Sequence, residues 1–341
     1  MSQKLKLAIV GCGAIAELGH LPALAGHEDG EVVVLVDSNR ARAQKLADKF
    51  GVPTVMESVA GLEKLVDAAT IATPPSSHLP LASALMRAGV DVLVEKPLAN
   101  SHEECQEMDR VAVETGRVCA VGMLRRFYWA DRHVKQVIEA GLYGPLRSFT
   151  AENGYPFEWP SASRFILSKA EAGGGVLMGL GSHMLDTLFW WLGEPENFNF
   201  RSDAHGGMDS ECLVEMTMPD GARGTLELSR SRQLANSYVL DFELASLKLP
   251  LYGNVLETQL KGSPYLVRDT VTPASDPSAK VDDFQPLRDQ FTDFAAAIRS
   301  RGTPMSTVSQ VARTIGFIGR CYAAAQPYPM GWIKPIELPA A

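Results

Sequence analysis

The sequence predicts an α/β protein in two parts: a doubly wound parallel sheet first, then an α+β region with a large, mostly antiparallel open sheet. Over the first 122 residues, short apolar segments alternate with amphipathic segments of helical length, which is typical of βαβ units. A glycine-rich turn follows the first apolar segment directly. After Gly122, polar and apolar residues alternate, as in antiparallel strands that are exposed on one face.

Length and composition agree with this division. A chain of 341 residues is too long for one ordinary core, and we predict two domains, 1–122 and 123–341, with a cleft between them. The net charge of -8 and the scattered Lys and Arg residues argue against nucleic acid as a partner. The apolar runs are shorter than the roughly 20 residues of a membrane helix. The N-terminus enters a strand-like segment without room for a secretory leader, so we expect a cytoplasmic protein.

Five apolar segments of the first domain are predicted as strands, with helices between them. Branched apolar residues dominate these segments, as expected for parallel strands that are covered on both faces. The order strand, helix, strand predicts right-handed crossovers. The predicted strands are 5–10, 32–36, 68–72, 90–94 and 118–121.

The second domain begins with a helical pattern and then alternates. Pro219-Asp-Gly221 predicts a turn between two strands, and 273–280, rich in Pro, Ser and Asp, predicts an exposed loop. The last two helices are candidates for packing back onto the first domain. The predicted strands are 146–155, 210–218, 222–230 and 238–249, and the predicted helices are 130–140, 175–192, 286–299 and 307–324.

The turn after the first strand, Gly11-Cys-Gly13-Ala14-Ile15-Ala16, matches the Gly-x-Gly-x-x-Ala form of the dinucleotide fingerprint and opens a helix. Gly11 permits the tight turn, Gly13 permits close approach of a pyrophosphate, and Ala16 is small enough for helix to strand packing. The free amides at the helix N-terminus favour the phosphates. We therefore predict a Rossmann domain that binds a nicotinamide dinucleotide.

Asp37 ends the second strand, 24 residues after Gly13, where the fingerprint expects an acid for the ribose hydroxyls of the adenosine. A carboxylate there repels a 2′-phosphate, so we predict NAD as the cofactor. Ser38 and Arg40 leave NADP as the alternative. Asp37 or Ser38 also fits the N-cap of the next helix, and the two roles are compatible.

The fifth strand ends abruptly in Glu95, Lys96 and Pro97. Open α/β sheets bind ligands outside the carboxyl ends of their strands, so both charged side chains are expected at a ligand edge. Pro97 keeps Lys96 out of the α region. Taken alone, the two charges also fit a solvated ion pair at a strand end, and the fingerprint upstream favours the ligand site.

Four segments in this order resemble the glucose-fructose oxidoreductase, inositol dehydrogenase and rhizopine-catabolism family (Gfo/Idh/MocA). They are the fingerprint at Gly11, Ala72-Thr-Pro-Pro-Ser-Ser-His78, Glu95-Lys96-Pro97 and the run from Gly173 to Asp186. The last is similar to the family's second-domain motif, a glycine triplet followed by Asp-x-Gly-x-His-x-x-Asp. The resemblance covers nearly the whole chain and implies the fold and an NAD(P) cofactor, while the substrates of the family vary widely.

The resemblance also implies residue roles. Hydride transfer from a carbinol carbon requires loss of the hydroxyl proton, and a positioned acid/base contributes roughly 10²- to 10⁴-fold. Lys96 is implied to lie near the nicotinamide and exchange this proton, with His183 facing it across the cleft. Burial lowers the pKa of such a lysine. Thr73, Pro74, His78 and Glu95 are implied to line the nicotinamide half of the cofactor site.

The chain departs from the family motif at Gly179, where the motif has an aspartate four residues before the histidine. In the family this aspartate helps to hold substrate and histidine, so its absence calls for another residue. Tyr155 and Trp159 also fit a packing role, and Asp186 an ion pair or cap. The candidates for substrate binding are Arg126, chosen over Arg125, and Tyr155, Trp159, Arg164 and Asp186.

These features predict an oxidoreductase that uses NAD(H) to interconvert a secondary alcohol and a ketone on a sugar, cyclitol or related polyol. Redox-neutral elimination or epimerisation is one alternative, and a cofactor-binding protein without catalysis, motivated by Gly179, is another. An open sheet face predicts a homodimer or homotetramer. No metal site and no disulfide is predicted, since neither the remaining histidines nor the five cysteines show suitable spacing.

Overall fold

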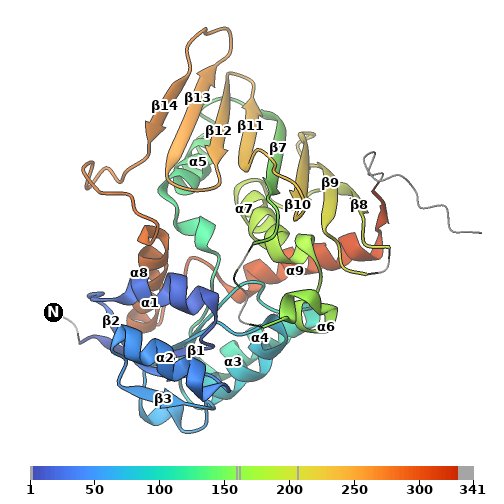
Figure 1. Ribbon diagram of the computed structural model, residues 1–341. Helices are drawn as coiled ribbons and strands as arrows, with labels where there is room; N and C mark the ends of the chain where they lie inside the picture. Colours follow the sequence, from blue (N-terminus) through green and yellow to red (C-terminus); the bar gives the residue numbers. More distant parts are fainter. Residues whose placement is uncertain (1–2, 159, 161–162, 206, 329–341) are drawn as a thin grey trace, which may run out of the picture.

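The computed structural model describes residues 3–158, 160, 163–205 and 207–328, and it contains a parallel and a mostly antiparallel sheet (Figure 1). The first sheet consists of β1 (Leu5–Val10), β2 (Gly30–Val36), β3 (Thr54–Met56), β4 (Ala68–Ile71), β5 (Asp91–Val94) and β6 (Cys119–Val121). Its strands are parallel in the order β3-β2-β1-β4-β5-β6, which is the doubly wound arrangement of a Rossmann domain. The predicted fold class is confirmed.

The five strands predicted for this sheet begin and end within two residues of the observed ones. The sequence pattern does not reveal β3. Its three residues are half-buried at the sheet edge, so the segment is too short to show either alternation or a continuous apolar run.

Helices cover both faces of the first sheet. A π-helical turn, Ala16–His20, leads into α1 (Leu21–Leu24), and α2 (Arg40–Phe50), α3 (His78–Arg87) and α4 (His102–Thr115) follow. Pro22 lies in this first helix and has no N–H to donate one turn back, which accounts for the widened turn before it.

Two helices from the end of the chain also pack against the first domain. Phe291 and Phe294 of α8 (Gln285–Ser300) join the same apolar cluster as Leu7 and Ile9 of β1. The helix α9 (Val308–Ala323) packs against α4, and Thr307 caps it in a capping box.

The second sheet follows the order β14-β13-β12-β11-β7-β10-β9-β8-β15. Its strands are β7 (Leu146–Gly154), β8 (Asn197–Ser202), β9 (Glu211–Thr217), β10 (Arg223–Ser229), β11 (Ser237–Phe242), β12 (Ala245–Pro250), β13 (Val255–Leu260), β14 (Val267–Thr270) and β15 (Gln326–Pro327). The helices of this part are α5 (Trp129–Glu139), α6 (Lys169–Ala172) and α7 (Ser182–Leu192), the last preceded by a π-helical turn, Leu177–Gly181.

One face of the second sheet packs on α7, where Leu185 and Leu188 share a core with Leu226 and Leu228 of β10. Buried residues alternate with half-buried ones along the middle of β9 and β10, so the other face is partly exposed. No helix of the described residues is drawn over this face in Figure 1. The homo-oligomer expected from it stays a prediction.

Three details of the second sheet differ from the sequence-based expectation. The segment 238–249 is two strands, β11 and β12, because the chain turns at Glu243 and Leu244 without a glycine or proline to mark the turn. The pattern also misses β8, β13, β14 and β15. In addition, β7 pairs with β10 in parallel, so the sheet is mixed.

No helix in the described ranges is long and apolar enough to cross a membrane.

Candidate active site

A cleft of about 920 Å³ lies between the two sheets, at the carboxyl ends of β1, β2, β4 and β5. Its volume lies in the range of small-molecule and cofactor sites. The first domain lines it with the fingerprint residues and with the ends of the later strands, and the second domain supplies the opposite wall. The predicted site residues that line it are Gly11, Gly13, Ala14, Ile15, Asp37, Ser38, Thr73, Pro74, Glu95, Lys96, Tyr155 and His183.

The two glycines of the fingerprint have different surroundings. Gly11 has φ +98°, and a Cβ there would lie 2.7 Å from the carbonyl oxygen of Ala72. A Cβ at Gly13 would meet no heavy atom within 4 Å, so open space lies over this residue. Ala16 is fully buried beneath the loop. The loop is therefore shaped as a cradle that fits a dinucleotide pyrophosphate at Gly13.

Asp37 lies at the other end of the cradle. Its carboxylate accepts hydrogen bonds from the amides of Cys12 (2.9 Å) and Asn39 (2.8 Å), and Arg42 lies 3.4 Å away. Asn39, not Asp37 or Ser38, caps α2, since its side chain accepts from the amide of Arg42. Asp37 thus ties the glycine loop to the end of β2 and lines the cleft.

Glu95 is buried and pairs with His20, a residue for which the sequence predicts no role. The Nε2 of His20 lies 2.8 Å from Oε1 of Glu95, and Oε2 accepts from the amide of Lys96 at 3.1 Å. Burial alone would raise the pKa of Glu95, but the hydrogen bond from His20 and the nearby Lys96 outweigh it and hold the pKa below its usual value. Glu95 is therefore a fixed carboxylate behind Lys96.

Lys96 reaches across the cleft to the second domain. Its Nζ donates a hydrogen bond to the carbonyl oxygen of Gly179 at 3.2 Å. Burial lowers the pKa of Lys96, Glu95 partly opposes this, and the positive charge of Arg230 lowers it further. The amine therefore releases its proton more readily than a lysine in water.

His183 lies in the opposite wall. Its Nδ1 is buried and has no hydrogen-bond partner among the described residues. Burial, followed by the charges of Lys96 and Arg125, lowers the pKa of His183 well below 6.5, so the ring is neutral at neutral pH. A neutral imidazole with an unsatisfied nitrogen is suited to a ligand hydroxyl.

The structure corrects the choice between the two adjacent arginines. Arg126 is buried in a two-pronged ion pair with Asp186, at 2.7 and 2.9 Å, and neither residue lines the cleft. Arg125 lines it, with its guanidinium paired to Asp131 at 2.8 Å. Asp186 is accordingly the acid of an ion pair and does not orient His183.

Two other predicted site residues do not line the cleft. His78 is fully buried, with Nδ1 3.1 Å from the carbonyl oxygen of Leu98 and Nε2 2.8 Å from that of Thr73, so it supports the loop that lines the cleft. Arg164 is exposed and is not a lining residue. Trp159 lies outside the described residues.

No group of three His, Cys, Asp or Glu residues in the part of the chain that the structure describes is placed to hold a metal ion. All five cysteines are free and buried.

Both halves of the chain match models of one family. Residues 5–123 match the model described as "Oxidoreductase family, NAD-binding Rossmann fold", and residues 132–248 match the "GFO/IDH/MocA C-terminal domain". The chain belongs to the Gfo/Idh/MocA family. Its first domain is therefore an NAD-binding Rossmann domain.

Several Gfo/Idh/MocA proteins and related structures are similar to this chain. D-glucoside 3-dehydrogenase of Escherichia coli is 29% identical over 62% of the chain and 61% of its own length. Trans-1,2-dihydrobenzene-1,2-diol dehydrogenase of Mus musculus is 30% identical over 68% and 71%. The crystal structure of aldose-aldose oxidoreductase from Caulobacter crescentus has a TM-score of 0.82 at 22% identity, over 94% and 97% of the two chains. The matched region spans about three fifths of the first of these relatives.

Arg230 occupies the space that Gly179 leaves free, and no sequence motif predicts it. A Cβ at residue 179 would overlap the guanidinium of Arg230. An aspartate here, as in the Gfo/Idh/MocA motif, would force this arginine to move. Arg230 lies 51 positions further along the chain, so no spacing rule links the two residues.

Proposed function

We propose that this protein is an NAD-dependent dehydrogenase or reductase that interconverts a secondary alcohol and a ketone on a sugar, cyclitol or related polyol. The observation that carries the proposal is the approach of Lys96 to Gly179, beside an unpartnered nitrogen of His183, in a cleft with a dinucleotide cradle. The names of the relatives from Escherichia coli and Mus musculus also support chemistry at CH–OH groups.

Each of the central residues of the cleft has a separate role in this reaction. When bound, the nicotinamide supplies the hydride acceptor or donor. The amine of Lys96 takes the hydroxyl proton as the alcohol is oxidised and returns it as the ketone is reduced. His183 holds the same oxygen or a neighbouring hydroxyl through its free nitrogen. Glu95, fixed by His20, accepts the amide of Lys96 and thereby orients the strand end.

A panel of sugars and cyclitols, incubated with NAD and the purified protein, tests this proposal. We expect at least one of them to yield NADH, seen in the reduced-nicotinamide absorbance band, in proportion to ketone formed. Product without net NADH would instead support redox-neutral elimination or epimerisation. Bound cofactor with no product from any compound would support a non-catalytic role.

We expect NADH to bind more tightly than NADPH. The carboxylate of Asp37 repels a 2′-phosphate, although Arg42 beside it reduces this repulsion. Asp37→Ser should lower the preference on the order of tenfold, which is about 1.4 kcal/mol, because Arg42 already offsets part of the repulsion. Fluorescence titration of the unaltered protein and the variant with both reduced cofactors measures this preference. Tighter binding of NADPH to the unaltered protein would refute the assignment.

The pH dependence of alcohol oxidation should report Lys96. Only the neutral amine accepts a proton, so kcat/KM is expected to rise with pH and to level off above the pKa of Lys96. Burial and Arg230 lower that pKa, so the rise should lie below the ordinary value of 10.5. Arg230→Gln removes a neighbouring positive charge and should move the rise to higher pH. An unchanged profile in this variant would contradict the assignment.

A further inference from the structure

Arg230 brings a positive charge into the cleft and forms no ion pair with a carboxylate of the described residues. It follows β10 directly, lines the cleft and is half-buried, with its guanidinium carbon 4.7 Å from the ring centre of Phe157. The carboxylate whose charge acts on it, Asp209, accepts hydrogen bonds from the amides of Gly175 and Leu177 and from the hydroxyl of Tyr322. A partly desolvated guanidinium is costly unless an anion accompanies it. Because Asp209 is engaged by these donors and forms no ion pair with Arg230, the guanidinium is suited to an anion from outside the chain.

A second cation meets Arg230 at the same place. Lys96 donates to the carbonyl of Gly179, and the guanidinium of Arg230 occupies the space where a side chain at 179 would begin. The carboxylates among the lining residues, Asp37, Glu57 and Glu95, all belong to the first domain. Among the described lining residues of the second domain, Arg125 and Arg230 are cationic and none is a carboxylate, while the buried Asp209, which does not line the cleft, partly offsets the charge of Arg230.

Two uncharged groups of the same cleft also lack partners among the described residues. The side-chain oxygen of Asn153 is buried without a hydrogen bond to any of them, as is Nδ1 of His183, and both residues line the cleft. Asn153 pairs with Leu228 across β7 and β10, two positions before Arg230. Buried polar atoms of this kind normally have a partner. Sugar hydroxyls would satisfy both atoms, while Arg230 needs a charged group.

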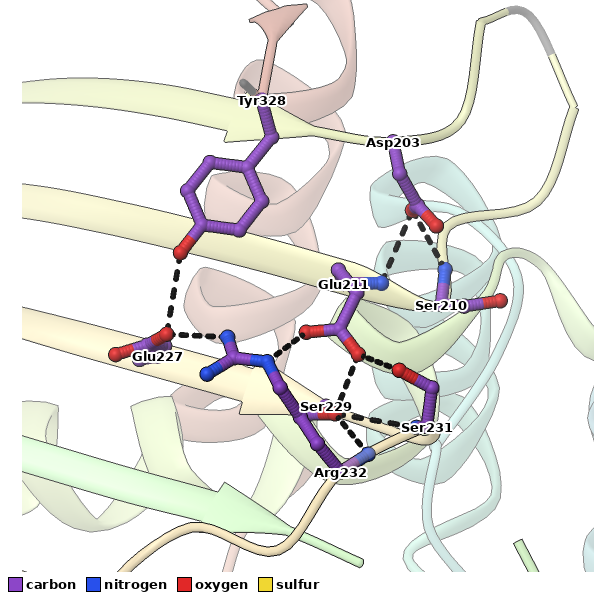
Figure 2. A network of polar contacts seen from close by, with 8 residues as sticks. All are labelled: Asp203, Ser210, Glu211, Glu227, Ser229, Ser231, Arg232 and Tyr328. Carbon is purple, nitrogen blue, oxygen red and sulfur yellow. Dashed lines mark hydrogen bonds and ion pairs between the residues drawn. The ribbon is translucent and has the colours of Figure 1, made fainter. Parts of the chain in front are cut away.

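A polar network anchors the two neighbours of Arg230 in the chain, Ser229 and Ser231 (Figure 2). The hydroxyls of Ser229 and Ser231, the two neighbours of Arg230, both donate to the buried carboxylate of Glu211, and Nε of Arg232 donates to it at 3.0 Å. Arg230 lies between these two anchored serines, at a bend that follows β10, and it lines the cleft. Anchored neighbours limit the backbone freedom of Arg230, which lowers the entropy cost of binding a ligand.

We propose that Arg230 binds a carboxylate of the substrate, and that the substrate class is therefore a sugar acid, such as a uronate, rather than a neutral sugar. The planar guanidinium matches a carboxylate through two parallel hydrogen bonds. Because Arg230 and Lys96 meet at residue 179, one six-carbon sugar acid spans both. The carboxylate then lies on Arg230 and a ring hydroxyl lies at Lys96. This inference rests on the proposed function for the identity of the reacting group, but not for the binding of the anion.

Calorimetry of the NADH-saturated protein tests it with two matched pairs of probes: D-glucuronate with D-glucose, and D-galacturonate with D-galactose. We expect at least one uronate to bind on the order of 10- to 100-fold more tightly than its neutral partner. Arg230→Gln should abolish that difference and leave the dissociation constant for NADH unchanged. Arg223→Gln, a matched change at an exposed arginine of β10, should preserve it.

The outcomes separate the two proposals. Equal or tighter binding of both neutral sugars, no binding of either uronate, or a preference that survives Arg230→Gln in a folded variant would overturn the role of Arg230. NADH production with neutral sugars in that case would leave the proposed function standing. Uronate binding that depends on Arg230, without NADH production from any probe, would support this inference and count against the proposed function.

Discussion

Replacing Lys96 with methionine is expected to lower kcat by about 10²- to 10⁴-fold, the contribution of a positioned acid/base. Methionine fills similar space without an amine, so neither proton transfer nor the hydrogen bond to Gly179 survives. Cofactor binding should persist, because the glycine loop and Asp37 remain intact. Steady-state kinetics and fluorescence titration with NADH measure the two effects separately.

The control is Lys64→Met, which changes an exposed lysine of the same domain and should leave both quantities unchanged. Retained turnover in Lys96→Met would remove this residue from the mechanism. Loss of NADH binding together with turnover would show that Lys96 acts mainly in holding the cofactor.

Replacing Gly11 with alanine should destabilise the first domain strongly. The residue has φ +98°, which costs a residue with a side chain about 1–2 kcal/mol, and the new Cβ would lie 2.7 Å from the backbone oxygen of Ala72. Backbone of a buried strand end cannot move freely, so overpacking adds roughly 1–3 kcal/mol. We expect the free energy of unfolding to fall by about 2–5 kcal/mol, measured by urea denaturation of the protein without cofactor.

Gly13→Ala is the matched comparison. No heavy atom lies within 4 Å of its added Cβ, so stability should hardly change. The Cβ instead enters the space that we assign to the pyrophosphate, and NADH should bind on the order of tenfold more weakly. Equal stability losses in the two variants, or unaltered NADH binding in Gly13→Ala, would contradict the proposed cradle.

Much of the fold, and of the cofactor side of the cleft, could be predicted from short sequence patterns. The fingerprint from Gly11 to Ala16 combines a turn requirement, a helix start and strand context within a few residues. Lys96 follows a strand whose branched apolar residues are evident, so its place at the sheet edge could be predicted. Such features depend on neighbours in the chain, which a sequence displays directly.

The features of the fold and of the site that could not be predicted depend on contacts between residues far apart in the chain. His20 and Glu95 are 75 residues apart, and nothing in the spacing connects them. Arg125 and Arg126 are adjacent, and their roles differ only because each finds a different buried acid, Asp131 or Asp186. The turn between β11 and β12 lacks glycine and proline, so no turn residue marks it, and its local sign is a shift of the buried positions from even numbers in β11 to odd numbers in β12.

A crystal structure with NADH and a bound sugar or sugar acid tests the central claim most directly. We predict that the pyrophosphate lies at Gly13, and that Nζ of Lys96 and a ring nitrogen of His183 lie within about 2.6–3.2 Å of substrate oxygens next to the nicotinamide. A substrate with no oxygen within reach of Lys96, or a nicotinamide bound away from Glu95 and Lys96, would contradict it.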